Sequence, residues 1–265
     1  MLGKLFKYEL KATGRIFLPL FLALLLFAVI NRFTLGPEGF DTPAMISMGI
    51  YIVILVGILV MTFIMMIQRF NKNLLSDEGY LMLTLPVKPW KHIVSKLFVS
   101  MLWIVISGIA ALMSILVIAL KNGDLTQFTE AFANSYRQAF ELLGASLYLL
   151  SFEIIIVLLA TLASGILIIY ASIAIGHLFN QHKMLASFGA FIALSALSDI
   201  LLKLFNLIPG TAYSSNIHIS SANDLIGMQP VIQMMIVSGI IFTGLACTAY
   251  FAITNYILSK RLNLE

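Results

Sequence analysis

Long apolar stretches, separated by short clusters of charged residues, dominate the pattern of hydrophobic and polar positions along the chain. Stretches of this kind predict membrane-spanning helices, because about 20 apolar residues in helical form cross the hydrocarbon core of a bilayer. A charged side chain in the middle of the bilayer is costly, so the charges mark where spans end. We predict six spans, at about residues 16–33, 44–68, 93–120, 143–176, 184–208 and 230–258.

The composition agrees with an all-α, polytopic membrane protein. The chain has 265 residues, of which 60% are hydrophobic and 11% are charged. A soluble domain carries about 25% charged residues, and disordered chains are poor in large apolar residues. Both classes are therefore excluded, and we expect residues 1–265 to form a single transmembrane domain. The lone cysteine, Cys247, excludes a disulfide framework within the chain.

The basic residues predict the orientation of the chain in the membrane. Of the 16 Lys and Arg residues, all but four fall in segments on the same side as the two termini. The four on the opposite side are Arg32, Lys121, Arg137 and Lys203. Because cytoplasmic segments are enriched in Lys and Arg, we expect a multi-pass protein of the cell membrane with both termini in the cytoplasm. The net charge of +4 is explained by this asymmetry and does not indicate nucleic acid as a partner.

The first fifteen residues have the pattern of an amphipathic helix. Four basic residues recur on one stripe of this helix, and the leucines and Phe6 point broadly the other way. The stripe consists of Lys4, Lys7, Lys11 and Arg15. Such a helix can lie in the headgroup layer with its lysines on anionic lipid. We expect an interfacial helix over residues 1–15, which either anchors the first span or also contacts a cytoplasmic partner.

A short cytoplasmic helix is predicted between the second and third spans. Ser76 and Asp77 offer capping side chains, and the following acidic residue would stand at the positive end of a helix. Leucine and methionine residues give the element an apolar body, and Pro86 and Pro89 end it. The pattern predicts a helix over residues 77–85, and by itself it fits an ordinary interfacial hairpin equally well.

This segment resembles the signature between spans two and three of ABC-2 type transporter permeases. The resemblance rests on the run Asp77-Glu78-Gly79-Tyr80-Leu81-Met82-Leu83-Thr84-Leu85-Pro86-Val87-Lys88, followed by Ile93 and Lys96. It implies a coupling helix seated in a cleft of a separate ATPase subunit, with contact residues Asp77, Glu78, Gly79, Tyr80, Leu81 and Pro86. Glu78 and Gly79 match the motif directly and Pro86 matches its turn, whereas Tyr80 and Ser95 differ from the family pattern.

The resemblance implies a transporter subunit that works with other chains. Members of the family export peptides, antibiotics, lipids and other hydrophobic compounds, with the pathway between two permease chains that are identical or different. No phosphate-binding loop of the form G-x-x-x-x-G-K-[ST] occurs in this sequence. We therefore expect no catalytic residue, metal or cofactor in this chain, with ATP and Mg²⁺ bound by the ATPase partner.

Three ionisable residues inside the predicted spans are further candidates. Asp199 and Lys203 stand four residues apart, in the order that favours a helical ion pair. They serve either a structural or interface role, or they line the pathway. Glu153 is the lone acid of the fourth span; it is either neutral and hydrogen-bonded, paired with another helix, or a proton-coupling site.

Other function classes remain open at this stage. A gradient-driven secondary transporter would use Glu153 with Asp199 and Lys203, and a membrane scaffold or sensor would transport nothing. A membrane serine protease is disfavoured, because Ser146 and His177 would lie about 46 Å apart on a continuous helix. His177 and His182 without further ligands are weak indications of a metal site.

Overall fold

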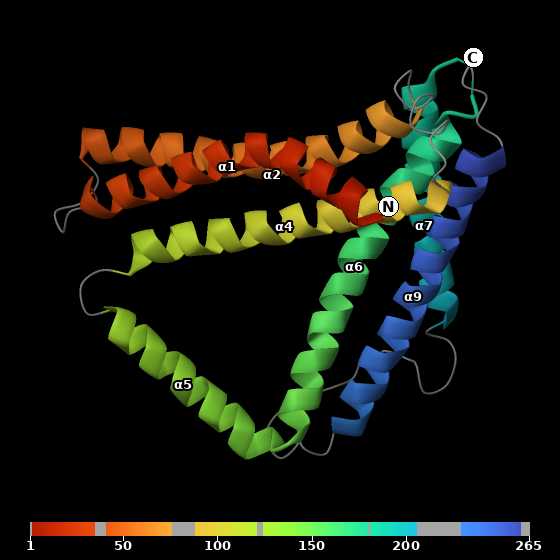
Figure 1. The fold of residues 1–265 in the computed structure, drawn as a ribbon. Coiled ribbons are helices and arrows are strands. Elements are labelled where there is room, and N and C mark those ends of the chain that lie inside the picture. Colours follow the sequence, from red (N-terminus) through yellow and green to blue (C-terminus); the bar gives the residue numbers. More distant parts are fainter. Residues whose placement is uncertain are drawn as a thin grey trace. The chain divides into compact units, whose positions relative to one another are not determined.

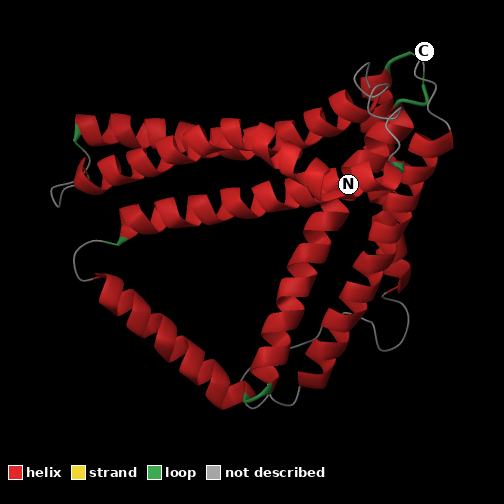
Figure 2. Cartoon of the chain, viewed as in Figure 1, coloured by secondary structure: helices red, strands yellow, loops and turns green. Residues whose placement is uncertain are grey.

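The computed structural model describes residues 2–34, 41–75, 88–120, 124–179, 181–205 and 229–260. Within these residues all regular secondary structure is helical (Figure 2). The helices, labelled as in Figure 1, are α1 (Leu2–Thr34), α2 (Thr42–Leu75), α4 (Pro89–Ala119), α5 (Asp124–Leu143), α6 (Ser146–Gly176), α7 (Lys183–Phe205) and α9 (Gln229–Lys260). The predicted all-α class is confirmed.

Six of these helices are long and apolar enough to cross a membrane. They cover Leu5–Thr34, Thr42–Lys72, Pro89–Ala119, Ser146–Gly176, Lys183–Phe205 and Pro230–Lys260. Each corresponds to one of the six predicted spans, so the predicted six-span architecture is confirmed. Together these helices indicate a multi-pass membrane protein.

The first span and the predicted N-terminal helix form one continuous element. Helix α1 runs from Leu2 to Thr34 without a break and passes through Pro19. The described basic side chains of its first half, Lys7, Lys11 and Arg15, are exposed on one stripe, as the pattern predicts. A position of residues 1–15 at the membrane surface stays a prediction. The predicted coupling helix over residues 77–85 lies outside the described residues.

The chain forms two compact units, residues 1–130 and 131–265. In the first unit, α1 packs against both α2 and α4, and the three helices run side by side (Figure 1). The core of this unit is built from one face of each helix, with Phe17, Phe21, Leu24 and Ala28 from α1, Tyr51, Ile58 and Met65 from α2, and Val99 and Trp103 from α4. The spacing of the α1 residues by three or four positions explains why a single face is buried.

Polar side chains bridge the three helices at several levels. The Asn31 amide and the Ser47 hydroxyl join α1 to α2, with Ser47 Oγ 2.9 Å from Asn31 Oδ1. Helices α2 and α4 are joined by the pairs Tyr51–Ser114, at 2.9 Å, and Thr62–Ser107, at 3.1 Å. Interhelical hydrogen bonds of this kind contribute to helix association where water is absent.

In the second unit, α6 packs against both α7 and α9, which barely contact each other. The connection from α6 to α7 is tight at Gly176, where a Cβ would lie 2.6 Å from the backbone nitrogen of Ser187. His182, just before α7, has a φ of 58°, a left-handed conformation that is uncommon for residues other than glycine. At the other end of α6, Gly144 turns the chain from α5 with a φ of 55°.

Candidate functional site

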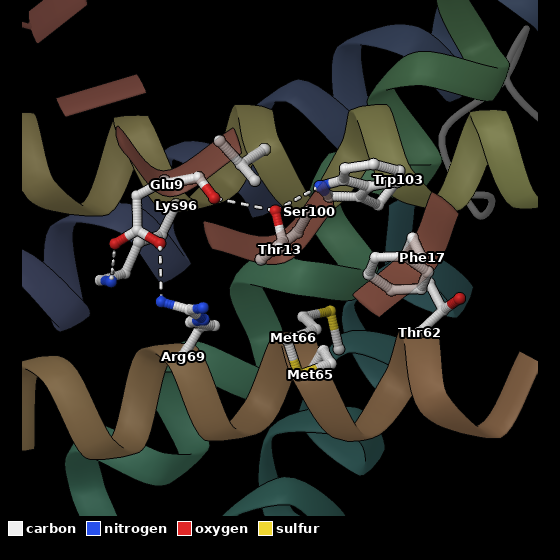
Figure 3. A pocket seen from close by; sticks show the side chains of 11 residues that line it. Glu9, Thr13, Phe17, Thr62, Met65, Met66, Arg69, Lys96, Ser100 and Trp103 are labelled. Atoms are coloured by element: carbon white, nitrogen blue, oxygen red, sulfur yellow. Dashed lines mark hydrogen bonds and ion pairs between the residues drawn. The ribbon is translucent and has the colours of Figure 1, made fainter. Parts of the chain in front are cut away.

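A buried charge cluster at the start of α1 is the most distinctive polar arrangement in the first unit. Glu9 lies on the face of α1 opposite the basic stripe, together with Thr13 and Phe17, and all three are buried. This face is the one that packs between α2 and α4, so the carboxylate of Glu9 is directed into the three-helix bundle (Figure 3).

The Glu9 carboxylate bonds two basic side chains from two different helices. Its Oε1 lies 2.6 Å from Lys96 Nζ, and its Oε2 lies 3.7 Å from Arg69 Nη1. The side chain of Lys96 is 3% exposed, that of Glu9 11% and that of Arg69 28%. A charge this deeply buried is tolerated only when it is paired, because desolvation otherwise costs several kcal/mol.

The residues of this cluster come from α1 and from the two helices that flank the segment 76–87. Arg69 belongs to the last part of α2, and Lys96 belongs to the first turns of α4. The segment 76–87, which contains the predicted coupling helix, connects these two helices in the chain. Glu9 therefore ties α1 to both helices that flank the segment, and we name Glu9, Arg69 and Lys96 the Glu9 junction.

A second layer of contacts continues from the Glu9 junction along the bundle. The indole Nε1 of Trp103 donates a hydrogen bond to the Thr13 hydroxyl over 2.7 Å, and the Thr13 hydroxyl donates to the carbonyl of Glu9 over 2.8 Å. The ring of Trp103 also stacks on Phe17, with 4.6 Å between the ring centroids. Electrostatic and aromatic contacts thus hold α1 to α4 over consecutive turns (Figure 3).

The cavity beside the Glu9 junction is too small for a transported molecule. It has a volume of about 20 Å³ and is lined by residues of the junction and by Met65, Met66 and Trp103. This space suffices for about one water molecule. The cluster is therefore suited to joining helices and not to binding a substrate.

Two further polar side chains of α4 are buried next to the Glu9 junction. His92 and Ser95 are each 2% exposed, and neither His92 Nε2 nor Ser95 Oγ has a hydrogen-bond partner among the described residues. They stand in the first two turns of α4, immediately after the segment 76–87. The entry of the chain into α4 is thus unusually polar for a buried helix end.

The residues that the sequence predicts for ATPase coupling, Asp77, Glu78, Gly79, Tyr80, Leu81 and Pro86, lie outside the described residues. Sequence reasoning missed Glu9, although the sequence holds a signal for it. Glu9 is the first acidic residue of the chain, and it falls on the apolar side of a helix whose other side is basic. An acid in that position requires a buried cationic partner.

Glu153 has a partner on another helix. In α6 its Oε1 accepts a hydrogen bond of 3.0 Å from Gln233 Nε2 of α9. This hydrogen bond joins α6 to α9, and Gln233 is a residue that the sequence pattern did not single out.

Asp199 and Lys203 do not form the ion pair that their spacing favours. Both side chains are exposed on α7, and no ion pair within 4.0 Å joins them. Among the described residues, the hydrogen-bond partner of Glu153 is Gln233 and neither Asp199 nor Lys203. Within the described part of the chain, no group of three or more His, Cys, Asp or Glu side chains could hold a metal ion.

Comparison with known proteins gives no relative: no family model, no curated protein and no solved structure matches this chain.

Proposed function

We propose that this chain is the membrane-spanning permease subunit of an ATP-driven transporter of the ABC-2 type. It would export peptides, antibiotics, lipids or other hydrophobic compounds together with a separate ATPase subunit, which binds ATP and Mg²⁺. The proposal rests on the resemblance of residues 77–88 to the family signature. The observation that carries it furthest is the Glu9 junction, which ties α1 to both helices adjoining that segment.

The proposed mechanism is the transmission of force from the ATPase to the helices. Closure of the ATPase around ATP would displace the segment 77–85 and with it the adjoining ends of α2 and α4. Because Glu9 bonds Arg69 of α2 and Lys96 of α4, α1 would follow the same displacement. A displacement of the helix ends next to the segment 77–85 would be transmitted along α1, α2 and α4, because packed helices with fixed side-chain contacts move as rigid elements.

The interhelical polar pairs extend this coupling to the opposite end of the unit. Thr62–Ser107 and Tyr51–Ser114 join α2 to α4, and Asn31–Ser47 joins α1 to α2. These pairs resist sliding of one helix past another, so the three spans would tilt together.

The proposal is tested by asking which chains remain bound to this one. We would purify the tagged full-length protein from its native membrane in mild detergent and identify the associated chains by mass spectrometry. An ATPase subunit should accompany the wild-type protein and be lost from Glu78→Lys, since a reversed charge at the contact disfavours docking.

The matched control is Glu141→Lys, which makes the same charge change at an exposed position of α5. It should retain the ATPase. Absence of an ATPase from the wild-type preparation, or equal recovery with Glu78→Lys, would contradict the proposal. Transport that needs an ion gradient and no nucleotide would instead support the gradient-driven alternative.

A further inference from the structure

Helix α5 separates apolar and charged residues onto opposite faces along its whole length. At 100° per residue, one face holds leucine and aromatic side chains, and every charged residue after Asp124 lies on the other face. The apolar face consists of Leu125, Phe128, Phe132, Tyr136, Phe140 and Leu143. The charged residues of the opposite face are Glu130, Arg137 and Glu141. Such a helix places its apolar face against an apolar partner and its charged face in water.

The connections at the two ends of α5 keep the helix along the membrane surface. Helices α4 and α6 are consecutive spans, so the end of α4 and the start of α6 face the same side of the membrane. Helix α5, with 20 residues, is about 30 Å long, whereas residues 120–123, which join it to α4, reach at most about 14 Å when fully extended. If α5 pointed away from the membrane, its first residue, Asp124, would lie beyond that reach.

The corner between α5 and α6 shows which face of α5 is turned toward the membrane (Figure 1). The chain bends at Gly144, whose φ is 55°, and the span of α6 begins at Ser146. The ring of Phe140 meets that of Tyr148 edge to face, with 6.0 Å between the centroids, and Tyr136 forms a side-chain hydrogen bond with the same tyrosine. Because Tyr148 lies in the first turn of the span, the apolar face of α5 lies on the inner side of the corner, toward the bilayer. All these residues belong to the second unit.

The composition of α5 suits the surface of a bilayer and not its interior. Helix α5 is not one of the six helices apolar enough to cross a membrane, because its charged face is continuous. Four of the six side chains on its apolar face are aromatic, and tyrosine in particular favours the level of the lipid headgroups. Amphipathic helices of this kind lie in the plane of the interface, with the apolar face about 5–10 Å deep.

We propose that α5 binds the lipid surface on the side of the membrane opposite the N-terminus. The apolar face enters the boundary between headgroups and acyl chains, and Glu130, Arg137 and Glu141 stay in water. Because this charged face carries two acids and one base, the attraction is apolar, and zwitterionic lipid is sufficient for binding. The bound helix holds the adjoining ends of α4 and α6 at a fixed depth. The binding does not depend on the ATPase coupling proposed above.

The accessibility of spin labels in the full-length protein tests this binding. In a Cys247→Ala background, the variants Phe132→Cys and Asn134→Cys place single labels on opposite faces of α5. The labelled protein would be reconstituted in phosphatidylcholine vesicles, and collisions with oxygen, which concentrates in lipid, and with a water-soluble nickel chelate would be measured. The label at Phe132→Cys should collide mainly with oxygen, and the label at Asn134→Cys mainly with nickel.

The other results of this measurement each name a different occupant of the apolar face. Frequent nickel collisions at both positions would show that α5 stands in water. Few collisions with either reagent at Phe132→Cys would show that protein covers the face, whether from this chain or from another. Exclusion of nickel only after anionic phosphatidylglycerol is added would show that binding needs charge. Any of the three would overturn the proposal.

A charge placed on either face gives a second, matched measurement. The label would stand at Phe128→Cys, on the apolar face, and an aspartate would be added at one of two nearby positions. Phe132→Asp should raise the nickel collisions of the label, because a carboxylate is costly in the apolar layer and draws α5 toward water. Asn134→Asp adds the same charge to the polar face and should leave the collisions unchanged. Equal effects of the two aspartates would contradict binding through the apolar face.

Discussion

At the scale of single residues, Glu9 joins three helices with one carboxylate. One of its oxygens forms an ion pair with Lys96 of α4, and the other forms an ion pair with Arg69 of α2. A substitution at Glu9 therefore changes the contacts of α1 with both helices. The lysine it neutralises is almost completely buried. A charge buried in this way cannot be stabilised by bulk water, so its contact with Glu9 contributes to the stability of the first unit.

We predict that Glu9→Gln destabilises the protein by up to about 3–5 kcal/mol, because it removes the carboxylate charge that lies 2.6 Å from the buried Lys96. The measurement is thermal unfolding in detergent, followed by the loss of monodisperse protein. Lys7→Gln, which changes one exposed charge on the same helix, should have almost no effect.

The double variant Glu9→Gln with Lys96→Met provides the decisive comparison. Replacing a buried pair with apolar or neutral groups of similar volume is often close to neutral, whereas breaking it is not. The double variant should therefore be more stable than Glu9→Gln alone. If the two unfold at the same temperature, the ion pair is not the source of the effect.

The sequence predicted the exposed stripe of Lys7, Lys11 and Arg15, because helical periodicity is a local property. It could not predict the partners of Glu9, since Lys96 is 87 positions away and only the packing of α1 on α4 brings them together. The same holds for the bond between Gln233 and Glu153, which joins residues 80 positions apart.

At the scale of elements, the connection between α6 and α7 depends on a close approach. Gly176 ends α6 directly against the backbone of Ser187 in the first turns of α7. We predict that Gly176→Ala forces the two helices apart and costs about 1–3 kcal/mol, as overpacking does. Thermal unfolding in detergent measures this loss.

A glycine in the same helix serves as the control. A Cβ at Gly165 would meet no atom within 4 Å, so Gly165→Ala should be neutral or gain up to about 1 kcal/mol from better helix propensity. Equal effects of the two substitutions would show that the contact with Ser187 is unimportant.

The observed helix boundaries show which span ends could be predicted from the positions of the charged residues and which could not. Five of the predicted spans agree with the observed helices to within a few residues, since the intervals without charge and the helices coincide. The first observed span starts at Leu5, before the predicted start at residue 16. The basic residues between these two positions occupy one face of the helix and do not interrupt it. The break between α5 and α6 depends on the left-handed Gly144, which hydrophobicity alone does not reveal.

At the scale of the whole molecule, the distribution of basic residues predicts that both termini face the cytoplasm. A green fluorescent protein fused to the C-terminus should fluoresce, and alkaline phosphatase fused there should be inactive. The reverse should hold for fusions after Lys121. Active phosphatase at the C-terminus would contradict the predicted orientation and the cytoplasmic position of the segment 77–85.

Six apolar helices could be predicted from the sequence, because each is a long local pattern. The predicted ATPase contact, at residues 77–85, lies outside the described part of the chain. What the structure adds is the Glu9 junction, which connects the flanking helices to α1. The proposed function therefore requires that force enters the molecule between α2 and α4.

The most direct measurement is site-specific photo-cross-linking in native membranes. A photoreactive amino acid at Leu81 should yield, on illumination, a covalent product of this chain with an ATPase subunit, identified by mass spectrometry. The same amino acid at Phe132, exposed on α5, should not. No ATPase product at Leu81, or equal products at both positions, would contradict the proposed coupling.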